Sequence, residues 1–597
     1  MAARKPRKAI KSAEESPVAA ILAAACIGLV LPVAELPLPT DPVMPLRLIV
    51  LGAALALGML APSRNRLSRR MAIALGVGAA VFVVAALIGR TPLLSLIGRY
   101  PRYEGLPMIA AYAAALAVGA RVLTSAQPRR VFASAVALGA GANGVVAVGQ
   151  AVFAGGERVT GLLSNSTTLG TFGLIALVVV GWSLATHARP LLWVGAVGAA
   201  ACIVLSASRG VLVGVGASLV VALLLRSRAA KPPRWYVLAG AAALVMAGAL
   251  LVPSTAARVT GSSPFAESTI TGRLLLWGES VQLWLAHPLA GVGPSRFVDA
   301  INPFHTAQWA AAVGPYAPPD SPHDVVLQVV CATGILGVVA LLVIGVMAVR
   351  DAVVVRSPQL VTAATVAAGL LSTYLTSFTD PITTTLGAFV VGGALAVRHE
   401  APLAKPVRIA TATGIGALSL WLGLSLIVAE VQYSRTLTAT SPMNSAQSAI
   451  AARPWDPDVA RRIAYTVTAL AGSSGPDIRY VLDPLRHACA QLPDSVECLL
   501  TLSSATDVSG DHPAALQAAD AALAVDSTNV DAHLARGIAL AGLSRSAESE
   551  AAFLAAAQLR PSAPEPWTDL AKLYDSLGRP SDGTAARAKA TELTKKR

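Results

Sequence analysis

Long uninterrupted runs of apolar residues dominate the first 430 residues of the chain. A helix needs about 20 apolar residues to cross a bilayer. Runs of that length centre near residues 26, 54, 80, 114, 142, 177, 198, 217, 244, 337, 368, 389 and 419. They lack the period-2 alternation of a membrane barrel. The pattern therefore predicts an all-α fold, with a polytopic transmembrane bundle of about thirteen spans over residues 1–430.

Composition supports this interpretation. Of the 597 residues, 54% are hydrophobic and 13% are charged, and the mean hydropathy is +0.62. Soluble proteins contain about 25% charged residues, and a disordered chain needs low hydrophobicity to stay unfolded. A water-soluble globular protein and a disordered chain are both excluded.

The net charge of +14 comes from the membrane region, because the chain from Val431 onward has 16 basic and 18 acidic residues. The excess of basic residues lies in short loops between apolar runs, and such loops are usually on the cytoplasmic side of the membrane. We therefore expect no nucleic-acid partner. The basic connections are 64–70, 121–130, 226–234, 350–356 and 398–408.

These basic loops alternate along the chain and follow a basic N-terminus (Arg4, Lys5, Arg7, Lys8 and Lys11). The alternation predicts a multi-pass protein of the inner or cytoplasmic membrane with a cytoplasmic N-terminus. An odd number of spans then places the C-terminal region outside. The loop containing Arg90, Arg99 and Arg102 breaks the charge rule on the external side, and residues 253–323 form an external loop too long for a simple connector.

Residues 431–597 have the composition of soluble helices and repeat at an offset of 34 residues. Asp526 aligns with Arg560, and His533 aligns with Trp567. This period is typical of tetratricopeptide hairpins, with a more degenerate unit over 492–525 and a further candidate at 445–462. The repeats predict an external solenoid, either as a folded cap or as a groove for a peptide, glycan or protein partner.

The five cysteines fall into two groups, three in the membrane region and two in the tail. Cys26, Cys202 and Cys331 lie in or beside apolar runs and are expected to pack between helices. Cys489 and Cys498 lie in the tail and can pair if the tail is outside the cytoplasm, but the sequence leaves the pairing open.

Candidate chemistry gathers in five external segments. Arg99 and Arg102 stand among aromatic residues, and Arg158 lies at the mouth of a span. Arg209 lies in a short Ser-Arg-Gly turn, while Arg273 and Trp277 are spaced to share one helical face. His323, in Pro322-His323-Asp324, immediately precedes the span centred near residue 337.

The order of these motifs resembles the O-antigen ligase and O-antigen polymerase superfamily of membrane glycosyltransferases. The resemblance rests on the Ser-Arg-Gly turn, Arg-x-x-x-Trp followed by His-Pro-Leu-x-Gly-x-Gly, and Pro-His-Asp before Gly334-Ile335-Leu336-Gly337. It covers roughly residues 90–400, and appended tetratricopeptide repeats are common in the superfamily. Asp324 departs from the family pattern, which more often has Asn.

The resemblance implies transfer of a glycan from a polyprenyl (undecaprenyl) pyrophosphate to an acceptor on the external face, as in cell-envelope polysaccharide biosynthesis. Arg binds phosphate oxygens bidentately and stays protonated, so we expect Arg209 and Arg273 to hold the leaving pyrophosphate. Arg99, Arg102, Arg158 and Trp277 are the expected substrate-binding residues. His323 is assigned to the acceptor proton, because imidazole accepts protons near neutral pH.

Several alternatives stay open. An external Arg at the end of a span is often only an interfacial anchor. The external carboxylates form no clustered motif, so we expect metal-independent transfer without a cofactor. The acceptor is a lipid, a protein or a wall glycan, and ligase and polymerase remain alternatives. A non-catalytic transporter or scaffold for glycan assembly is the rival from another class, but the spans contain few of the ionisable groups that transporters use.

Overall fold

The computed structural model describes most of the chain. The described residues are 17–34, 36, 38, 44–153, 158–163, 165–228, 235–260, 264–313, 319–355, 357, 359–438, 442–471 and 478–595. The basic N-terminal residues, Glu157, Lys231, Arg234 and Arg356 lie outside this part.

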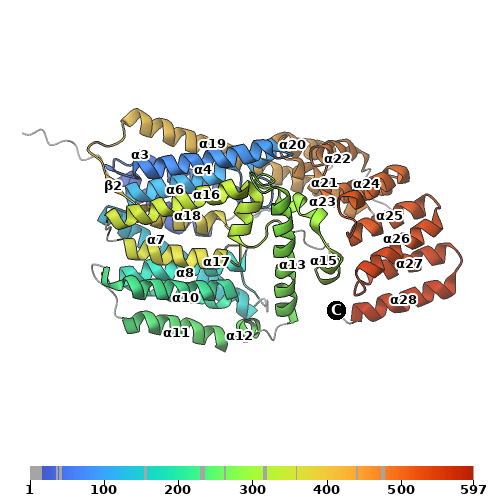
Figure 1. Ribbon diagram of the computed structural model, residues 1–597, viewed down its shortest axis with the longest axis horizontal. Coiled ribbons are helices and arrows are strands. Elements are labelled where there is room, and N and C mark those ends of the chain that lie inside the picture. Colours follow the sequence, from blue (N-terminus) through green and yellow to red (C-terminus); the bar gives the residue numbers. More distant parts are fainter. Residues whose placement is uncertain are drawn as a thin grey trace, which may run out of the picture.

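The membrane region is a bundle of helices, and all thirteen predicted centres fall within helical segments. The first segment joins α1 (Val18–Ala25), a π-helical turn η1 (Cys26–Val30) and α2 (Leu31–Val33). It is followed by α3 (Met44–Leu60), α4 (Arg69–Ile88), α6 (Leu106–Val122), α7 (Ala126–Phe153), α8 (Ser166–Leu184), α9 (Pro190–Leu205), α10 (Arg209–Leu225) with η2 (Arg226–Arg228), α11 (Trp235–Leu251), α16 (Val325–Val355), α17 (Leu360–Tyr374), α18 (Pro381–Ala394) and α19 (Lys405–Thr438) (Figure 1).

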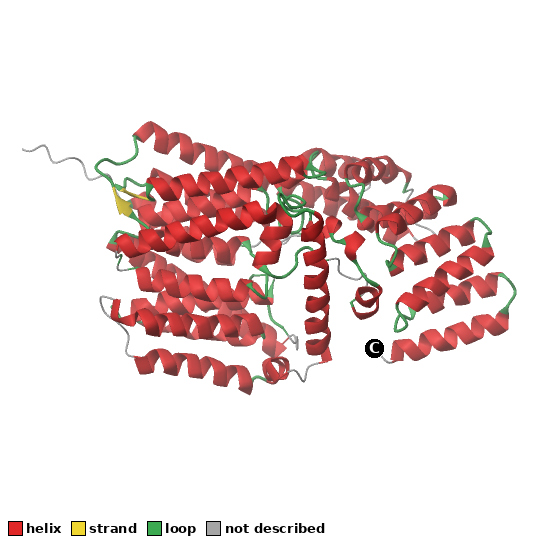
Figure 2. Cartoon of the chain, viewed as in Figure 1, coloured by secondary structure: helices red, strands yellow, loops and turns green. Residues whose placement is uncertain are grey.

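Within the described residues, six helices are long and apolar enough to cross a membrane, and seven further apolar helices are shorter. Small residues allow the bundle to pack closely. An added Cβ on Gly195 of α9 would lie 2.4 Å from the Cβ of Ala137 in α7, and one on Gly144 would lie 2.7 Å from the Cα of Gly198. The all-α prediction is confirmed, and Figure 2 shows how little strand there is.

Predicted basic loops meet at one end of the bundle. There β1 (Asn65–Arg66) pairs antiparallel with β2 (Val397–Arg398). The guanidinium of Arg121 donates to the carbonyl of Met59 (3.1 Å), and that of Arg408 donates to the carbonyl of Leu60 (3.1 Å). The tail lies at the opposite end from β2 (Figure 1).

Residues between the spans build a layer at the tail end of the bundle. It contains α5 (Pro92–Ile97), α12 (Pro253–Thr260), α13 (Pro264–Ala286), α14 (Phe297–Ala300), η3 (Asn302–Phe304) and α15 (Ala307–Ala312). Helix α13 runs across the direction of the bundle helices (Figures 1 and 2). This orientation places one face of α13 over the ends of the spans.

The tail consists of paired helices. They are α20 (Pro442–Ala452), α21 (Pro457–Ala471), α22 (Arg479–Gln491), α23 (Val496–Val508), α24 (His512–Val525), α25 (Val530–Gly542), α26 (Ser546–Leu559), α27 (Glu565–Ser576) and α28 (Pro580–Lys595). The hairpins α23–α24, α25–α26 and α27–α28 follow the predicted repeat. A disulfide between Cys489 and Cys498 joins α22 to α23, with Cα atoms 5.4 Å apart. Helix α19 continues through Val431, so the change in composition falls inside a helix.

Buried ion pairs fasten the tail to the membrane region. The guanidinium of Arg99 binds both carboxylate oxygens of Asp458 in α21 and also contacts Asp299 in α14. The side chains of Arg99 and Asp299 are each 2% exposed, and that of Asp458 is 1% exposed. Arg296 pairs with Asp299 at 2.7 Å, and Arg461 pairs with Asp458 at 3.0 Å. Although burial acts in the opposite direction, the two Asp side chains raise the pKa of Arg99.

We expect Arg99→Ala to lower the free energy of unfolding by about 3 kcal/mol, because truncation removes one partner of a buried ion pair while Arg296 and Arg461 remain. Thermal unfolding of the full chain in detergent measures the loss. Asp458→Ala should lower the transition temperature in the same way. The control Arg486→Ala removes a surface pair with Asp483, which is 90% exposed, and should cost less than about 1 kcal/mol. Equal transitions for Arg99→Ala and the control would contradict the fastening role.

Candidate active site

A cavity of about 350 Å³ at the tail end of the bundle contains four arginines. Arg158 precedes α8, Arg209 begins α10, Arg258 belongs to α12, and Arg273 belongs to α13. Trp277, one turn after Arg273, lines the same cavity. The cavity therefore brings together four of the sequence-predicted residues and adds Arg258, which the sequence reasoning missed. We call these four guanidinium groups the arginine cluster.

Backbone geometry places Arg209 at the cavity. The turn before α10 contains Ala207 with φ 48°, a left-handed conformation that costs energy for a residue with a Cβ. Ser208, the N-cap, makes no side-chain capping hydrogen bond, and Gly210 lies so close to Thr376 that an added Cβ would be 2.3 Å from the hydroxyl oxygen. The N-terminal end of α10 therefore faces the cavity with its dipole and Arg209, an arrangement that suits an anion.

The hydrogen bonds described for these arginines go to a backbone carbonyl and to a neutral side chain. The Nε of Arg209 donates to the carbonyl of Arg258, and Nη2 of Arg158 donates to the hydroxyl of Thr167 at 3.1 Å. Nη2 of Arg209 and Nε of Arg258 are buried and have no hydrogen-bond partner in the described part of the chain. Such orphaned charged donors are costly unless a ligand satisfies them.

The charges around the cavity also favour a bound anion. The residues described around this cavity include no carboxylate. Burial, with Arg258 and Arg273 nearby, lowers the pKa of Arg158 to about 10, and burial together with Arg209 lowers the pKa of Arg273. Concentrated positive charge without compensation requires an anionic ligand to become favourable. The chemistry of this lining suits an anionic group such as a phosphate or pyrophosphate.

His323 lies beside the arginine cluster and is linked to it by Trp277. The indole Nε1 of Trp277 donates to the carbonyl of Pro322 at 2.9 Å, and His323 itself has φ 53°. Its ring lies 5.4 Å from the ring of Phe378. Burial is the main cause that lowers the pKa of His323 to about 4; Arg273 and Arg102 act in the same direction, and nearby Asp320 opposes them. The imidazole is therefore neutral near pH 7 and able to accept a proton.

The His-Pro-Leu-x-Gly-x-Gly motif has a structural role. Helix α16 breaks at Gly334 (φ 63°), and residues 288–293 pair with the broken stretch through backbone hydrogen bonds. Val292 N donates to the Cys331 carbonyl at 2.9 Å, and Ile335 N donates to the Pro288 carbonyl at 2.9 Å. An added Cβ on Gly334 would lie 2.2 Å from the Leu289 carbonyl oxygen. The glycines thus allow a close backbone crossing that satisfies peptide groups at a helix break.

Asp324 also has a structural explanation. One carboxylate oxygen accepts from the backbone N–H groups of Val326 (2.8 Å) and Leu327 (2.9 Å), so Asp324 caps α16. Asn caps helices as well as Asp does. The departure from the family pattern therefore preserves the local function.

Two of the predicted substrate-binding residues lie away from the cluster. Arg99 lies in the buried ion pairs with the tail described above. Arg102 contacts Glu104 at 3.1 Å and donates to the Thr379 carbonyl at 2.6 Å; its guanidinium lies 4.5 Å from the centre of the Phe378 ring. Within the described residues, no three His, Cys, Asp or Glu side chains gather as metal ligands.

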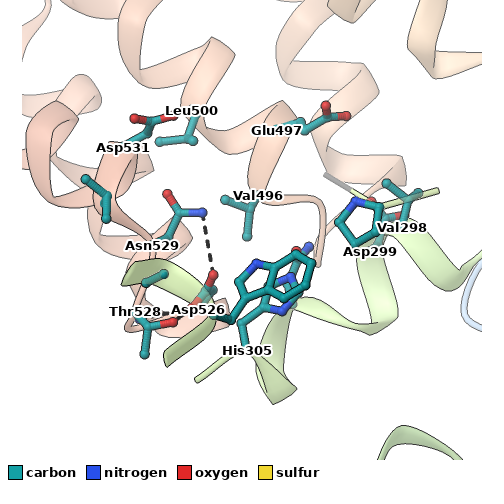
Figure 3. A pocket seen from close by; sticks show the side chains of 15 residues that line it. Val298, Asp299, His305, Val496, Glu497, Leu500, Asp526, Thr528, Asn529 and Asp531 are labelled. Carbon is teal, nitrogen blue, oxygen red and sulfur yellow. Dashed lines mark hydrogen bonds between the residues drawn. The ribbon is translucent and has the colours of Figure 1, made fainter. Parts of the chain in front are cut away.

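The long segment between α11 and α16 also touches the repeats. Ala310 of α15 packs with Val530 of α25 and Ala556 of α26. Beside this contact lies a small cavity of about 60 Å³, where Figure 3 shows His305 from the loop and Asp526 and Asn529 from the repeats. His305 stacks on Trp309 with ring centres 4.9 Å apart. This face of the repeats is therefore occupied by the protein's own loop.

Comparisons with known proteins match these regions in part. Residues 194–342 match the family described as O-antigen ligase. The solved structure of TTC0263, a thermophilic TPR protein of Thermus thermophilus, is 24% identical and covers 28% of this chain and 91% of its own, with a TM-score of 0.24. MamA (41-end) from Desulfovibrio magneticus RS-1 is 12% identical and covers 29% of this chain and 96% of its own, with a TM-score of 0.25. No curated protein matched.

Proposed function

We propose that this protein transfers a glycan from a polyprenyl pyrophosphate donor to an acceptor on the external face of the cytoplasmic membrane. The arginine cluster and His323 lie largely within the region that matches the O-antigen ligase family. The observation that carries the proposal is a cavity with four arginines and no carboxylate among its described lining residues. A ligand with two adjacent phosphates would supply the missing negative charge.

In the proposed reaction, the arginine cluster binds the donor and His323 acts on the acceptor. An acceptor hydroxyl oxygen forms a bond to the anomeric carbon of the donor sugar, and its proton passes to His323. The bond between that carbon and the pyrophosphate oxygen breaks, and the electron pair leaves with the polyprenyl pyrophosphate. Charge on the leaving group grows in the transition state, so Arg209, Arg258 and Arg273 stabilise departure as well as binding. The arginines fulfil the electrostatic role, and we propose that no divalent metal or cofactor is needed.

We favour ligase-like transfer, in which the glycan is attached to a separate acceptor, over polymerisation of polyprenyl-linked repeat units. A tail used only as a protein-recruiting scaffold is the second candidate, but the contact between α15 and the repeats favours a tail that supports the transferase itself.

We place the tail and the arginine cluster on the external face of a cytoplasmic membrane. The support is the gathering of the basic loops at the other end of the bundle and the disulfide between Cys489 and Cys498, because disulfides persist in oxidising compartments. An impermeant thiol reagent applied to intact cells should label Ser544→Cys, an exposed site in the tail, but not Arg228→Cys. Labelling of Arg228→Cys alone would invert the topology.

Substitutions in the arginine cluster should weaken donor binding. Arg273→Ala or Arg258→Ala should cost about 2–5 kcal/mol, because each leaves pyrophosphate charge unpaired, and Arg273→Lys should lose less because it keeps the charge but not the planar fork. Binding of undecaprenyl pyrophosphate to the full chain in nanodiscs measures the effect. The matched control is Arg228→Ala, at the far end of α10. Parent-like affinity of both alanine variants would show that these arginines are only anchors.

The pH dependence of kcat/KM should reflect the lowered pKa of His323. Since kcat/KM follows the free enzyme, we expect it to stay constant as the pH falls from 7 to 5 and to decline only near a pKa of about 4, where the imidazole gains its proton. An ordinary histidine would titrate near pH 6.5. Assays are run in EDTA, in which the parent should remain active.

His323→Ala should lose about 10²–10⁴-fold in turnover while donor binding persists. His287→Ala, an exposed histidine at the end of α13, is the control and should retain activity. Partial recovery in His323→Gln would assign the residue to orienting the acceptor. A parent profile that falls near pH 6.5 would contradict the lowered pKa, and full activity of His323→Ala would contradict the assigned base.

A further inference from the structure

A second cavity, of about 530 Å³, lies at the same end of the bundle and extends along α4, α6 and α16. We call it the α4–α6–α16 groove. Its walls are apolar, with Ala79 and Phe82 from α4, Ile109 from α6, and Leu341 and Ile344 from α16. One end is polar and is lined by Arg102, Glu104, Tyr112, Ser295, Asp320 and Gln328. The groove thus joins a surface for hydrocarbon to a surface for a polar group.

Four buried polar atoms at this groove have no hydrogen-bond partner within the described chain. They are Nη1 of Arg102, Oη of Tyr112, Oγ of Ser295 and Oε1 of Gln328. Each orphaned group carries a desolvation cost that a ligand can remove. The set includes one donor, one acceptor and two hydroxyls that can do both, which matches a ligand that is itself rich in hydroxyl groups.

Charge distinguishes this groove from the arginine cluster. Arg102 is paired with Glu104 at 3.1 Å, and Asp320 lines the same end. Arg99 also lines the groove, where it is already paired with Asp299 and Asp458. A pyrophosphate here would therefore face the carboxylates of Glu104 and Asp320 and two cations that already have partners. The polar end therefore favours an uncharged headgroup.

The groove also reaches the segment that carries His323. Asp320 and Ser321, just before His323, line the groove, whereas Pro322 is held by Trp277 of the arginine cavity. The ring of Phe378 contacts both the guanidinium of Arg102, which lines the groove, and the imidazole of His323. The polar end of the groove therefore lies close in sequence and through Phe378 to the proposed base.

We propose that the α4–α6–α16 groove binds the acceptor, and that the acceptor is a glycolipid with an uncharged sugar headgroup. This inference rests on the proposed transfer reaction and narrows it. The acceptor sugar hydroxyl forms the new glycosidic bond, its proton goes to His323, and the donor leaves from the arginine cluster as polyprenyl pyrophosphate. A polymerase acceptor would bring a second polyprenyl pyrophosphate, which the paired charges of this groove disfavour.

Photocrosslinking tests the site without the donor. The full chain in phosphatidylcholine nanodiscs is exposed to glucosyl diacylglycerol bearing a diazirine on one acyl chain. We expect adducts concentrated on peptides of α4, α6 and α16, displaced by unlabelled glucosyl diacylglycerol but not by undecaprenyl pyrophosphate. Because no donor is present, failure of the arginine assignment would leave this result unchanged.

Two adjacent alanines of α4 provide a matched pair. Ala79 lines the groove, whereas its neighbour Ala80 is exposed outside it. Ala79→Phe should reduce crosslinking about tenfold by filling the groove, and Ala80→Phe should leave it unchanged. Gln328→Leu should abolish the preference for the glucosyl lipid over diazirine-labelled diacylglycerol without sugar. Equal labelling of the two phenylalanine variants, or displacement by undecaprenyl pyrophosphate as effective as by the glycolipid, would overturn the proposal.

Discussion

Uncompensated positive charge at the arginine cluster is the constraint around which this end of the protein is organised. Arg99 and Arg296 show the other way in which the chain handles buried guanidinium groups, since each is neutralised by carboxylates from the loop or the tail. The cluster lacks such partners among its described lining residues. The two arrangements separate arginines that join the tail to the membrane region from arginines that we propose to bind an anionic ligand.

The scaffold around the cluster depends on close backbone packing more than on side-chain chemistry. The break of α16 at Gly334 admits the segment at the end of α13, and its peptide groups are satisfied there. This crossing fixes α13, and α13 in turn carries both Arg273 and Trp277. Trp277 then holds the backbone beside His323. One continuous set of contacts therefore relates the anion cavity to the proposed base.

Much of the fold could be predicted from sequence, because apolar run length and the 34-residue repeat are local signals. Helical spacing also placed Arg273 and Trp277 on one face. Contacts between segments that are distant in sequence could not be predicted from such local signals. Nothing in the sequence near Arg99 indicates that Asp458, 359 residues later, would bind it. Arg258 was missed for the same reason, although a basic residue within the long loop that was predicted to be external was a signal that could have been followed.

A cryo-EM structure of the full chain with polyprenyl pyrophosphate would test the central assignment most directly. The account predicts phosphate density within hydrogen-bond distance of Arg209, Arg258 and Arg273, with Nη2 of Arg209 and Nε of Arg258 satisfied by its oxygens. Phosphate density at the polar end of the α4–α6–α16 groove, with the arginine cavity empty, would contradict it.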